Sequence, residues 1–189
     1  MPKLRASLPV LSALPAFDEK TGDLTVVIET PKGSGNKYDY DAQCGAFRLA
    51  DVMHEGQTFP YDFGFVPATL AEDGDPLDVV VLMDAPVPTG CVLTARLLGA
   101  IEAKQRKNKN GKAWERNDRL LAVATHARTH QHIMGLADLR PNELDEIETF
   151  FVNYAGTKGK TFRPLKRAGA KAARKLVKHG MKAFAKQKG

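Results

Sequence analysis

Short apolar runs separated by Gly, Pro and Asp fill most of the first 125 residues. The runs are rich in Val, Ile, Leu and Thr, which favour an extended chain. They predict strands at 24–29, 37–41, 79–83, 91–101 and 120–124. Strands this short, with turn residues between them, are typical of a small barrel.

Two later segments have helical periodicity. After Pro141, apolar side chains recur every three or four residues with acidic ones opposite, and the apolar positions are Leu144, Ile147, Phe150, Phe151 and Tyr154. A second series runs from 164 to 184 with Lys and Arg between its members, which are Leu165, Ala168, Ala172, Leu176, Val177, Met181 and Phe184. This series predicts an amphipathic helix that is interrupted or kinked near Gly180.

Charge divides the chain into an acidic body and a basic tail. Residues 1–157 carry 16 − 22 = −6 and residues 158–189 carry +12, within a total of +6 over 189 residues. We therefore expect one domain at 1–157, including an irregular N-terminal arm, and a basic helical extension at 158–189. The extension either packs on the acidic body or binds nucleic acid, polyphosphate or an anionic membrane.

Composition disfavours several classes of protein. Cys44 and Cys91 lack the spacing of a disulfide framework or a zinc site, so we expect reduced thiols and a cytoplasmic protein. No apolar run reaches membrane-spanning length, so we expect no transmembrane segment. An export signal at 3–17 is disfavoured because Pro9 and Pro15 divide its apolar stretch.

Two polar patterns could bind metal. Asp73, Asp75 and Asp78 immediately precede the strand expected at 79–83, where closely spaced carboxylates would repel one another unless a hard divalent cation held them. The alternative is a plain Asp-Gly/Asp-Pro turn. His126, His130 and His132 form a His-x-x-x-His-x-His pattern that could bind zinc, although a loop of surface histidines is favoured.

The acidic segment Asp-Gly-Asp-Pro-Leu-Asp at 73–78 resembles the signature of the soluble family I inorganic pyrophosphatases. Five further segments resemble that family in the same order, and together they span about 24–157: Val-Val-Ile-Glu-Thr-Pro at 26–31, Asn-Lys-Tyr-Asp at 36–39, Phe-Pro-Tyr-Asp-Phe-Gly-Phe at 59–65, Asn-Asp-Arg-Leu-Leu-Ala-Val at 117–123 and Phe-Phe-Val-Asn-Tyr at 150–154. The resemblance implies a mainly β fold, namely a five-stranded OB-like barrel with flanking and C-terminal helices. It also implies metal-dependent hydrolysis of pyrophosphate and a homo-oligomer.

Carried over by position, the resemblance implies a role for ten residues. Asp75 would act as the base that deprotonates the attacking water. The implied metal ligands are Asp73, Asp78, Glu29, Asp39 and either Asn117 or Asp118, and the implied phosphate ligands are Lys37, Arg119 and Tyr154. The implied cofactor is Mg²⁺, with Mn²⁺ or Zn²⁺ as alternatives.

Several positions depart from the family pattern. Asp51 stands in place of an arginine, Asn117 in place of an aspartate, Arg119 and Ala155 in place of lysines, and Phe59 and Phe63 in place of tyrosines. A basic loop at 103–112 replaces a loop with a catalytic aspartate. That loop either supplies new phosphate contacts, marks the loss of the trimetal mechanism, or is a solvated hairpin tip.

The departures leave two alternatives to pyrophosphate hydrolysis. One is a catalytically impaired homologue that binds polyanions or nucleic acid through the segment at 104–116 and the tail. The other is a hydrolase of another phosphoanhydride, such as a nucleotide.

Overall fold

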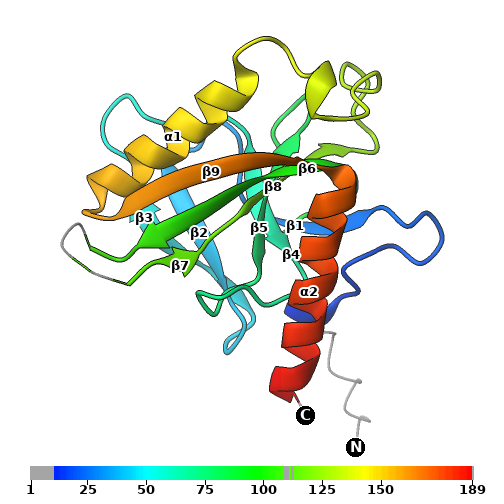
Figure 1. The fold of residues 1–189 in the computed structure, drawn as a ribbon, viewed down its shortest axis with the longest axis horizontal. Helices are drawn as coiled ribbons and strands as arrows, with labels where there is room; N and C mark the ends of the chain where they lie inside the picture. Colours follow the sequence, from blue (N-terminus) through cyan, green and yellow to red (C-terminus); the bar gives the residue numbers. More distant parts are fainter. Residues whose placement is uncertain (1–10, 109–110, 112, 189) are drawn as a thin grey trace, which may run out of the picture.

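A closed ring of five strands forms the centre of the structure, a computed structural model that describes residues 11–108, 111 and 113–188 (Figure 1). The order around the ring is β1, β4, β5, β8 and β6, and β6 pairs with β1 to close it. The strands of the ring are β1 (Leu24–Thr30), β4 (Asp62–Val66), β5 (Leu77–Leu82), β8 (Arg119–Ala124) and β6 (Val92–Arg106). Only β5 and β8 run parallel to each other.

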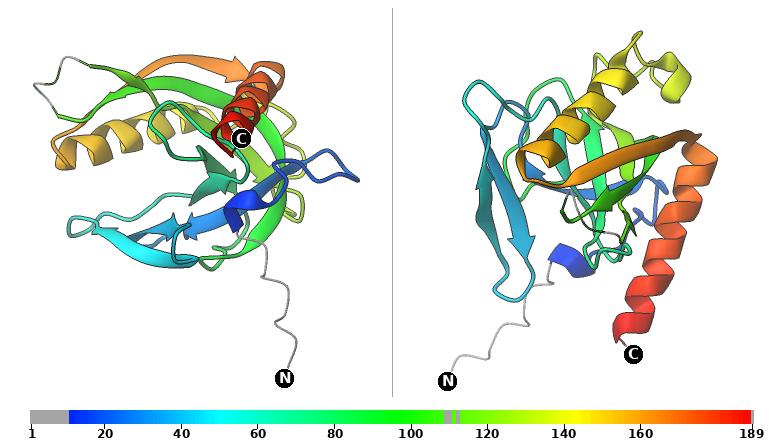
Figure 2. Two further views of the ribbon diagram at one scale, coloured as in Figure 1. Left: turned by 90° about the horizontal axis from the view of Figure 1, so that it is seen from below. Right: turned by 60° about the vertical axis from the view of Figure 1, so that its left-hand side comes forward.

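Other elements extend or flank this ring. β7 (Glu115–Arg116) and β9 (Thr161–Gly169) pair with β6, whereas β2 (Asn36–Asp41) and β3 (Ala46–Val52) form a separate hairpin beside the ring (Figure 2). The helices are the short η1 (Leu11–Ala13) and η2 (Leu136–Asp138), then α1 (Glu143–Thr157) and α2 (Ala170–Lys188). None of the described helices is both long enough and apolar enough to cross a membrane.

The ring strands bury both of their faces, because side chains alternate between two cores. Val79 and Val81 of β5 belong to the larger core, which also contains Ala173 and Val177 of α2. Val80, between them, belongs to a second core with Ile147 and Phe151 of α1. These strands therefore read as continuous apolar runs, and each helix covers one face.

One glycine allows the ring to close tightly. Gly64 pairs with Ile28 of β1 and with Val79 of β5. A Cβ atom at Gly64 would overlap the carbonyl oxygen of Val27 and lie 2.9 Å from the Cα atom of Ile28. Only glycine permits this approach of β4 to β1.

The structure confirms the predicted fold class, mainly β with flanking helices, and changes some element assignments. The strand predicted at 37–41 exists as β2 but lies outside the ring, and β4 takes the fifth place in the ring. β6 extends to Arg106, so part of the basic segment predicted as a loop at 103–112 is strand. Residues 109, 110 and 112 of that loop, and residues 1–10 of the predicted N-terminal arm, lie outside the described residues.

The predicted helix from 164 to 184 is wrong for its first six residues. Thr161–Gly169 forms strand β9, which pairs with β6 from Gly99 to Arg106. That ladder supplies backbone hydrogen bonds that outweigh local helical periodicity. The predicted break near Gly180 is also wrong, because α2 continues to Lys188 and approaches the backbone at Leu70, whose N–H donates to the Gly180 carbonyl over 3.1 Å.

Candidate active site

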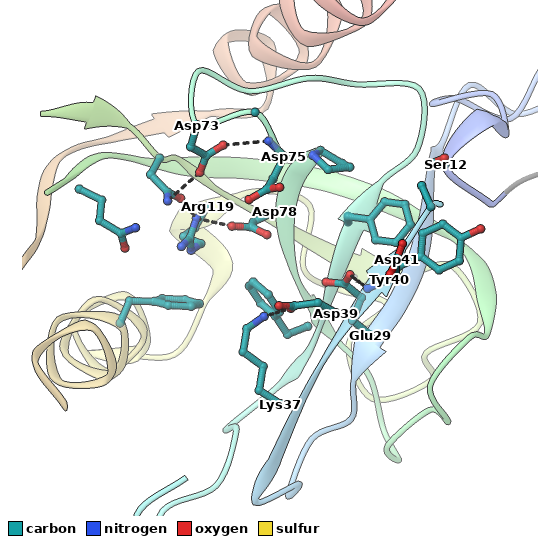
Figure 3. Close-up of a pocket in the computed structure, with 18 of the residues that line it drawn as sticks. Ser12, Glu29, Lys37, Asp39, Tyr40, Asp41, Asp73, Asp75, Asp78 and Arg119 are labelled. Carbon is teal, nitrogen blue, oxygen red and sulfur yellow. Dashed lines mark hydrogen bonds and ion pairs between the residues drawn. The ribbon is translucent and has the colours of Figure 1, made fainter. Parts of the chain in front are cut away.

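A polar cavity of about 790 Å³ opens between the β2–β3 hairpin, the loop before β5 and helix α1 (Figure 3). Nine of the ten residues with a predicted role line it, namely Glu29, Lys37, Asp39, Asp73, Asp75, Asp78, Asn117, Arg119 and Tyr154. They come from strands, loops and a helix that are far apart in sequence. The structure therefore brings together almost the entire set that the resemblance implied.

The three aspartates are presented by a tight loop and by the start of β5, which follows it. Gly74 has a left-handed φ of 95°, which suits glycine, and the Ala71 N–H donates to the Asp75 carbonyl over 2.8 Å. The Asp75 N–H in turn donates to Asp73 Oδ1 over 3.3 Å. The loop and the start of β5 direct all three carboxylates towards the same cavity (Figure 3).

Burial makes this concentration of negative charge costly. Desolvation, reinforced by the charge of Asp78, raises the pKa of Asp73 to about 6. The pKa of Asp78 is also raised by burial, although Arg119 opposes the shift. Buried carboxylates with raised pKa values are the oxygen donors that a hard divalent cation would stabilise.

A second acidic group faces them from β1 and β2. Glu29 is 8% exposed, and its Oε1 accepts a hydrogen bond from the Tyr40 N–H over 2.8 Å. Burial raises the pKa of Glu29 to about 8 despite the nearby Lys37. Burial alone would lower the pKa of Lys37, but its ion pair with Asp39 raises it.

Arg119 joins the acidic loop to the aromatic wall of the cavity. Its Nη1 lies 2.5 Å from Asp78 Oδ2, and its guanidinium lies 4.9 Å from the centre of the Phe151 ring and 5.2 Å from that of Phe162. It also donates to the Asn117 carbonyl oxygen, while Asn117 Nδ2 donates to Asp73 Oδ2 over 3.0 Å. Arg119, the first residue of β8, thus holds a permanent positive charge beside the carboxylates.

The structure does not place Asp118 in the cavity. Asp118 Oδ1 accepts hydrogen bonds from the Ala103 N–H over 2.9 Å and from Arg116 Nε over 2.6 Å. Arg116 also pairs with Glu102 of β6. Glu102 does not line the cavity either. This buried network leaves Asn117 as the member of the pair that faces the cavity.

The replaced positions have structural partners of their own. Asp51 pairs with Lys158, and Lys158 Nζ lies 5.0 Å from the centre of the Tyr154 ring. Burial raises the pKa of Tyr154. Ala155 is buried in the core beneath α1, so no cation projects from that position. Lys158, which follows α1, therefore places a cation over the ring of Tyr154.

The two replaced tyrosines keep an apolar role. Phe59 and Phe63 line the cavity, with ring centroids 5.7 Å apart, and both are almost fully buried in the α1 core. Their rings fill the wall without offering a hydroxyl group. The cations beside that wall are Lys37 and Arg119, which lie 5.8 Å and 5.9 Å from the centre of the Phe63 ring.

Sequence reasoning missed several polar residues of the cavity. They are Ser12, Tyr40, Asp41, Gln43, Gln105 and Gln187. Gln105 could have been found from strand periodicity. Every second residue of β6 points to the same face, and Ile101 and Ala103 on that face are buried in the α1 core, so Gln105 is the next residue on it. Gln187 had none, since α2 reaches the cavity only through the fold.

The carboxylates of the cavity do not form a metal-binding cluster by themselves. Among the described residues, no three His, Cys, Asp or Glu side chains are arranged to hold one metal ion. The residues still suit Mg²⁺, which keeps several of its waters and takes few protein ligands. His126, His130 and His132 do not form a metal-binding group either. His130 Nδ1 lies 3.2 Å from Asp84 Oδ1 instead.

Comparisons with known proteins agree with this geometry. Residues 26–185 match the family model described as inorganic pyrophosphatase. An inorganic pyrophosphatase of Nostoc is 37% identical over 174 residues, which are 92% of this chain and 98% of the relative. That of Thermus thermophilus is 34% identical over 179 residues, which are 95% of this chain and 98% of the relative.

Solved structures show the same relationship. The crystal structure of inorganic pyrophosphatase from Thermus thermophilus has a TM-score of 0.83 at 33% identity and covers 94% of this chain and 99% of its own. That from Neisseria gonorrhoeae has a TM-score of 0.80 at 30% identity, covering 91% and 96%. The acidic loop, the neighbouring cations Lys37 and Arg119 and the fold agree with these matches, and the chain belongs to the inorganic pyrophosphatase family.

Proposed function

We propose that the cavity carries out the activity of this family, the metal-dependent hydrolysis of inorganic pyrophosphate to two phosphates, by activating a water molecule at the Asp73–Asp78 loop. The observation that carries this proposal is that three aspartates, two on a tight loop and one at the start of β5, share a cavity with Lys37 and Arg119. Carboxylates suit metal ions, and the two cations suit phosphate oxygens. No observation favours a noncatalytic homologue or another phosphoanhydride as substrate. The test is phosphate release from pyrophosphate by the purified protein with millimolar Mg²⁺.

In this proposal each group has one task. Asp73 and Asp78 hold the metal ions, while Glu29, Asp39 and the carbonyl oxygen of Asn117 orient them directly or through water. When bound, these ions would lower the pKa of water and neutralise phosphate charge. Asp75 accepts the proton of the attacking water, and Lys37, Arg119 and Tyr154 bind the phosphate oxygens.

We propose Mg²⁺ as the physiological ion, with Mn²⁺ and Zn²⁺ as alternatives. The donor set is entirely oxygen, and no His or Cys lines the cavity among the described residues, which favours a hard cation over a soft one. Asp118 is left out of the ligand set because it does not line the cavity, whereas Asn117 does.

Metal affinity should rise with pH. Asp73, with a pKa of about 6, and Glu29, with a pKa of about 8, must lose protons before they can favour a cation. We expect Mg²⁺ to bind more tightly at pH 8 than at pH 6 and to release protons. Isothermal titration in buffers of different ionisation enthalpy measures both quantities. The Glu29→Gln variant should lose the part of the dependence near pH 8, and an unchanged profile would remove Glu29 from the site.

The Asn117→Asp substitution tests the altered ligand position. Asn117 is 6% exposed and donates to Asp73 over 3.0 Å. A carboxylate there would repel Asp73 and Asp78 but would offer a charged ligand. We expect about tenfold tighter Mg²⁺ binding, equal to about 1.4 kcal/mol, together with a lower Tm in EDTA.

A matched change controls for charge alone. The Asn153→Asp substitution adds the same charge on the exposed side of α1 and should leave Mg²⁺ affinity unchanged. Equal Mg²⁺ affinity of the Asn117→Asp and unsubstituted proteins would show that position 117 does not face the ion.

We further propose a homo-oligomer in the cytoplasm whose basic helix α2 contacts polyanions. Leu49 and Val52 of β3 are 59% and 60% exposed, which is unusual for large apolar side chains and suits a subunit contact. Cys44 and Cys91 are both free thiols, which suits a reducing compartment. Light scattering of the purified protein tests the oligomeric state, and cell fractionation tests the compartment.

A further inference from the structure

Five lysines form one row along the outer side of α2. They are spaced three or four residues apart and all are exposed: Lys171, Lys175, Lys178, Lys182 and Lys186. At about 100° per residue, this spacing confines them to a sector of roughly 80° around the helix axis. Ala173 and Val177, on the opposite side, are buried in the larger core, so the row faces away from the body.

The charge of this row is not neutralised by the protein. The segment 170–188 contains seven Lys or Arg residues and no Asp or Glu, which gives 7 − 0 = +7. None of the five lysines takes part in an ion pair within the described part of the chain. By contrast, Arg167, in β9 three residues before α2, pairs with both Asp145 and Glu148. The row is therefore available to an anion from solution.

The shape of the row suits a linear polyanion. From Lys171 to Lys186 the helix rises about 22 Å, so the charges follow one another roughly every 6 Å. A membrane surface would be held better by an apolar face, but that face of α2 is packed on the ring strands. A base could stack on the imidazole of His179, which is exposed beside Lys178, but one ring supplies a single stacking site along the whole row. What remains is attraction to a chain of closely spaced phosphates.

The row ends beside the active-site cavity. Gln187, the residue after Lys186, lines the same cavity as Asp75, and so do Ser12 and Gln43. The cavity therefore extends from the acidic loop to the last turn of α2, where Gln187 lies about 100° around the helix axis from Lys186. From its C-terminal end, α2 runs back along the body to β9 (Figure 2). A phosphate chain longer than pyrophosphate could leave the cavity at Gln187 and continue along the lysines.

We propose that the lysine row of α2 binds inorganic polyphosphate and places the end of the chain in the cavity, an inference that rests on the proposed pyrophosphatase site. Polyphosphate contains the same phosphoanhydride linkage as pyrophosphate. Its terminal phosphates can therefore bind the groups proposed for pyrophosphate, such as Lys37 and Arg119. Long chains then compete with pyrophosphate, and the lysine row determines how strongly they do so.

The test compares two triple variants that remove the same charge. One is Lys175→Gln/Lys178→Gln/Lys182→Gln in the row, and the control is Lys20→Gln/Arg128→Gln/Arg163→Gln at exposed sites elsewhere. Binding of labelled long-chain polyphosphate is followed by fluorescence anisotropy at several salt concentrations. Inhibition of pyrophosphate hydrolysis by unlabelled polyphosphate is measured in parallel.

We expect the row variant to bind polyphosphate at least tenfold more weakly and to need correspondingly more of it for inhibition. If each phosphate contact behaves as in single-stranded nucleic acids, the salt slope falls by about 2 for three lost contacts. The KM for pyrophosphate stays unchanged in both variants, and the control binds polyphosphate like the unsubstituted protein.

Three results would overturn the proposal. They are equal binding by the row variant, pyrophosphate hydrolysis that saturating polyphosphate does not inhibit, and equally tight binding of a single-stranded nucleic acid of the same charge. Anisotropy requires no turnover. A protein that binds polyphosphate through the row but does not hydrolyse pyrophosphate would therefore refute the proposed function separately.

Discussion

Replacing Asp75 by alanine should lower kcat for pyrophosphate by about 10² to 10⁴-fold, the usual range for a lost general base. Asp75 lies at the exposed tip of the acidic loop, between Asp73 and Asp78, and its side chain makes no hydrogen bond among those found in the described residues. Removing it should therefore cost little stability. Since the two neighbouring carboxylates remain, metal binding should persist while proton removal from water is lost.

The Asp75→Ala prediction needs a control in the same loop. Glu72 carries the same charge three residues earlier and does not line the cavity. The Glu72→Ala variant should keep kcat within about threefold, a change of less than about 0.7 kcal/mol in the barrier. Phosphate-release assays at saturating Mg²⁺ compare the two variants. If Asp75→Ala retained the activity of Glu72→Ala, another group would have to accept the proton.

Replacing Gly64 by alanine should prevent stable folding. A methyl group at this position would overlap the carbonyl oxygen of Val27, and both neighbouring strands hold the backbone in place through the pairs with Ile28 and Val79. We expect a loss of about 3 kcal/mol or more, because strand separation is the only relief. That is a large fraction of the total stability of a typical domain.

Denaturant unfolding measures this loss, and another glycine supplies the comparison. A Cβ at Gly35 would have its nearest neighbour, the Gln57 carbonyl oxygen, at 3.9 Å. Gly35→Ala should therefore change the free energy of unfolding by less than about 1 kcal/mol. A Gly64→Ala protein with an unchanged unfolding midpoint would mean that β1 and β4 can separate without cost.

The features that the sequence predicted well are those in which chemistry is local. Asp73, Gly74 and Asp78 lie within six residues, so the sequence alone places these carboxylates close together, and they do line one cavity. Strands β1, β5 and β8 are buried on both faces and appear as plain apolar runs. Family resemblance added the distant members of the cavity, such as Lys37 and Tyr154, which local reasoning would have left as ordinary surface and core residues.

The features that it missed depend on partners far along the chain. Nothing within 161–169 shows that this segment pairs with β6, and its Leu and Ala spacing resembles a helix. Likewise, Asn117 and Asp118 are adjacent acceptors, and only the positions of Ala103 and Arg116 determine which one faces the cavity. Gln187 reaches the cavity because β9 positions α2.

The pairing of β9 with β6 also has a consequence for the order in which the protein is made. The five ring strands have all been synthesised by residue 124, but Gly99–Arg106 of β6 gains its second partner only when residues 161–169 follow. Until then, a nascent chain carries an unpaired strand edge, which can recruit another chain. The segment 161–169, which is made only after all five ring strands, is thus the one that covers this edge.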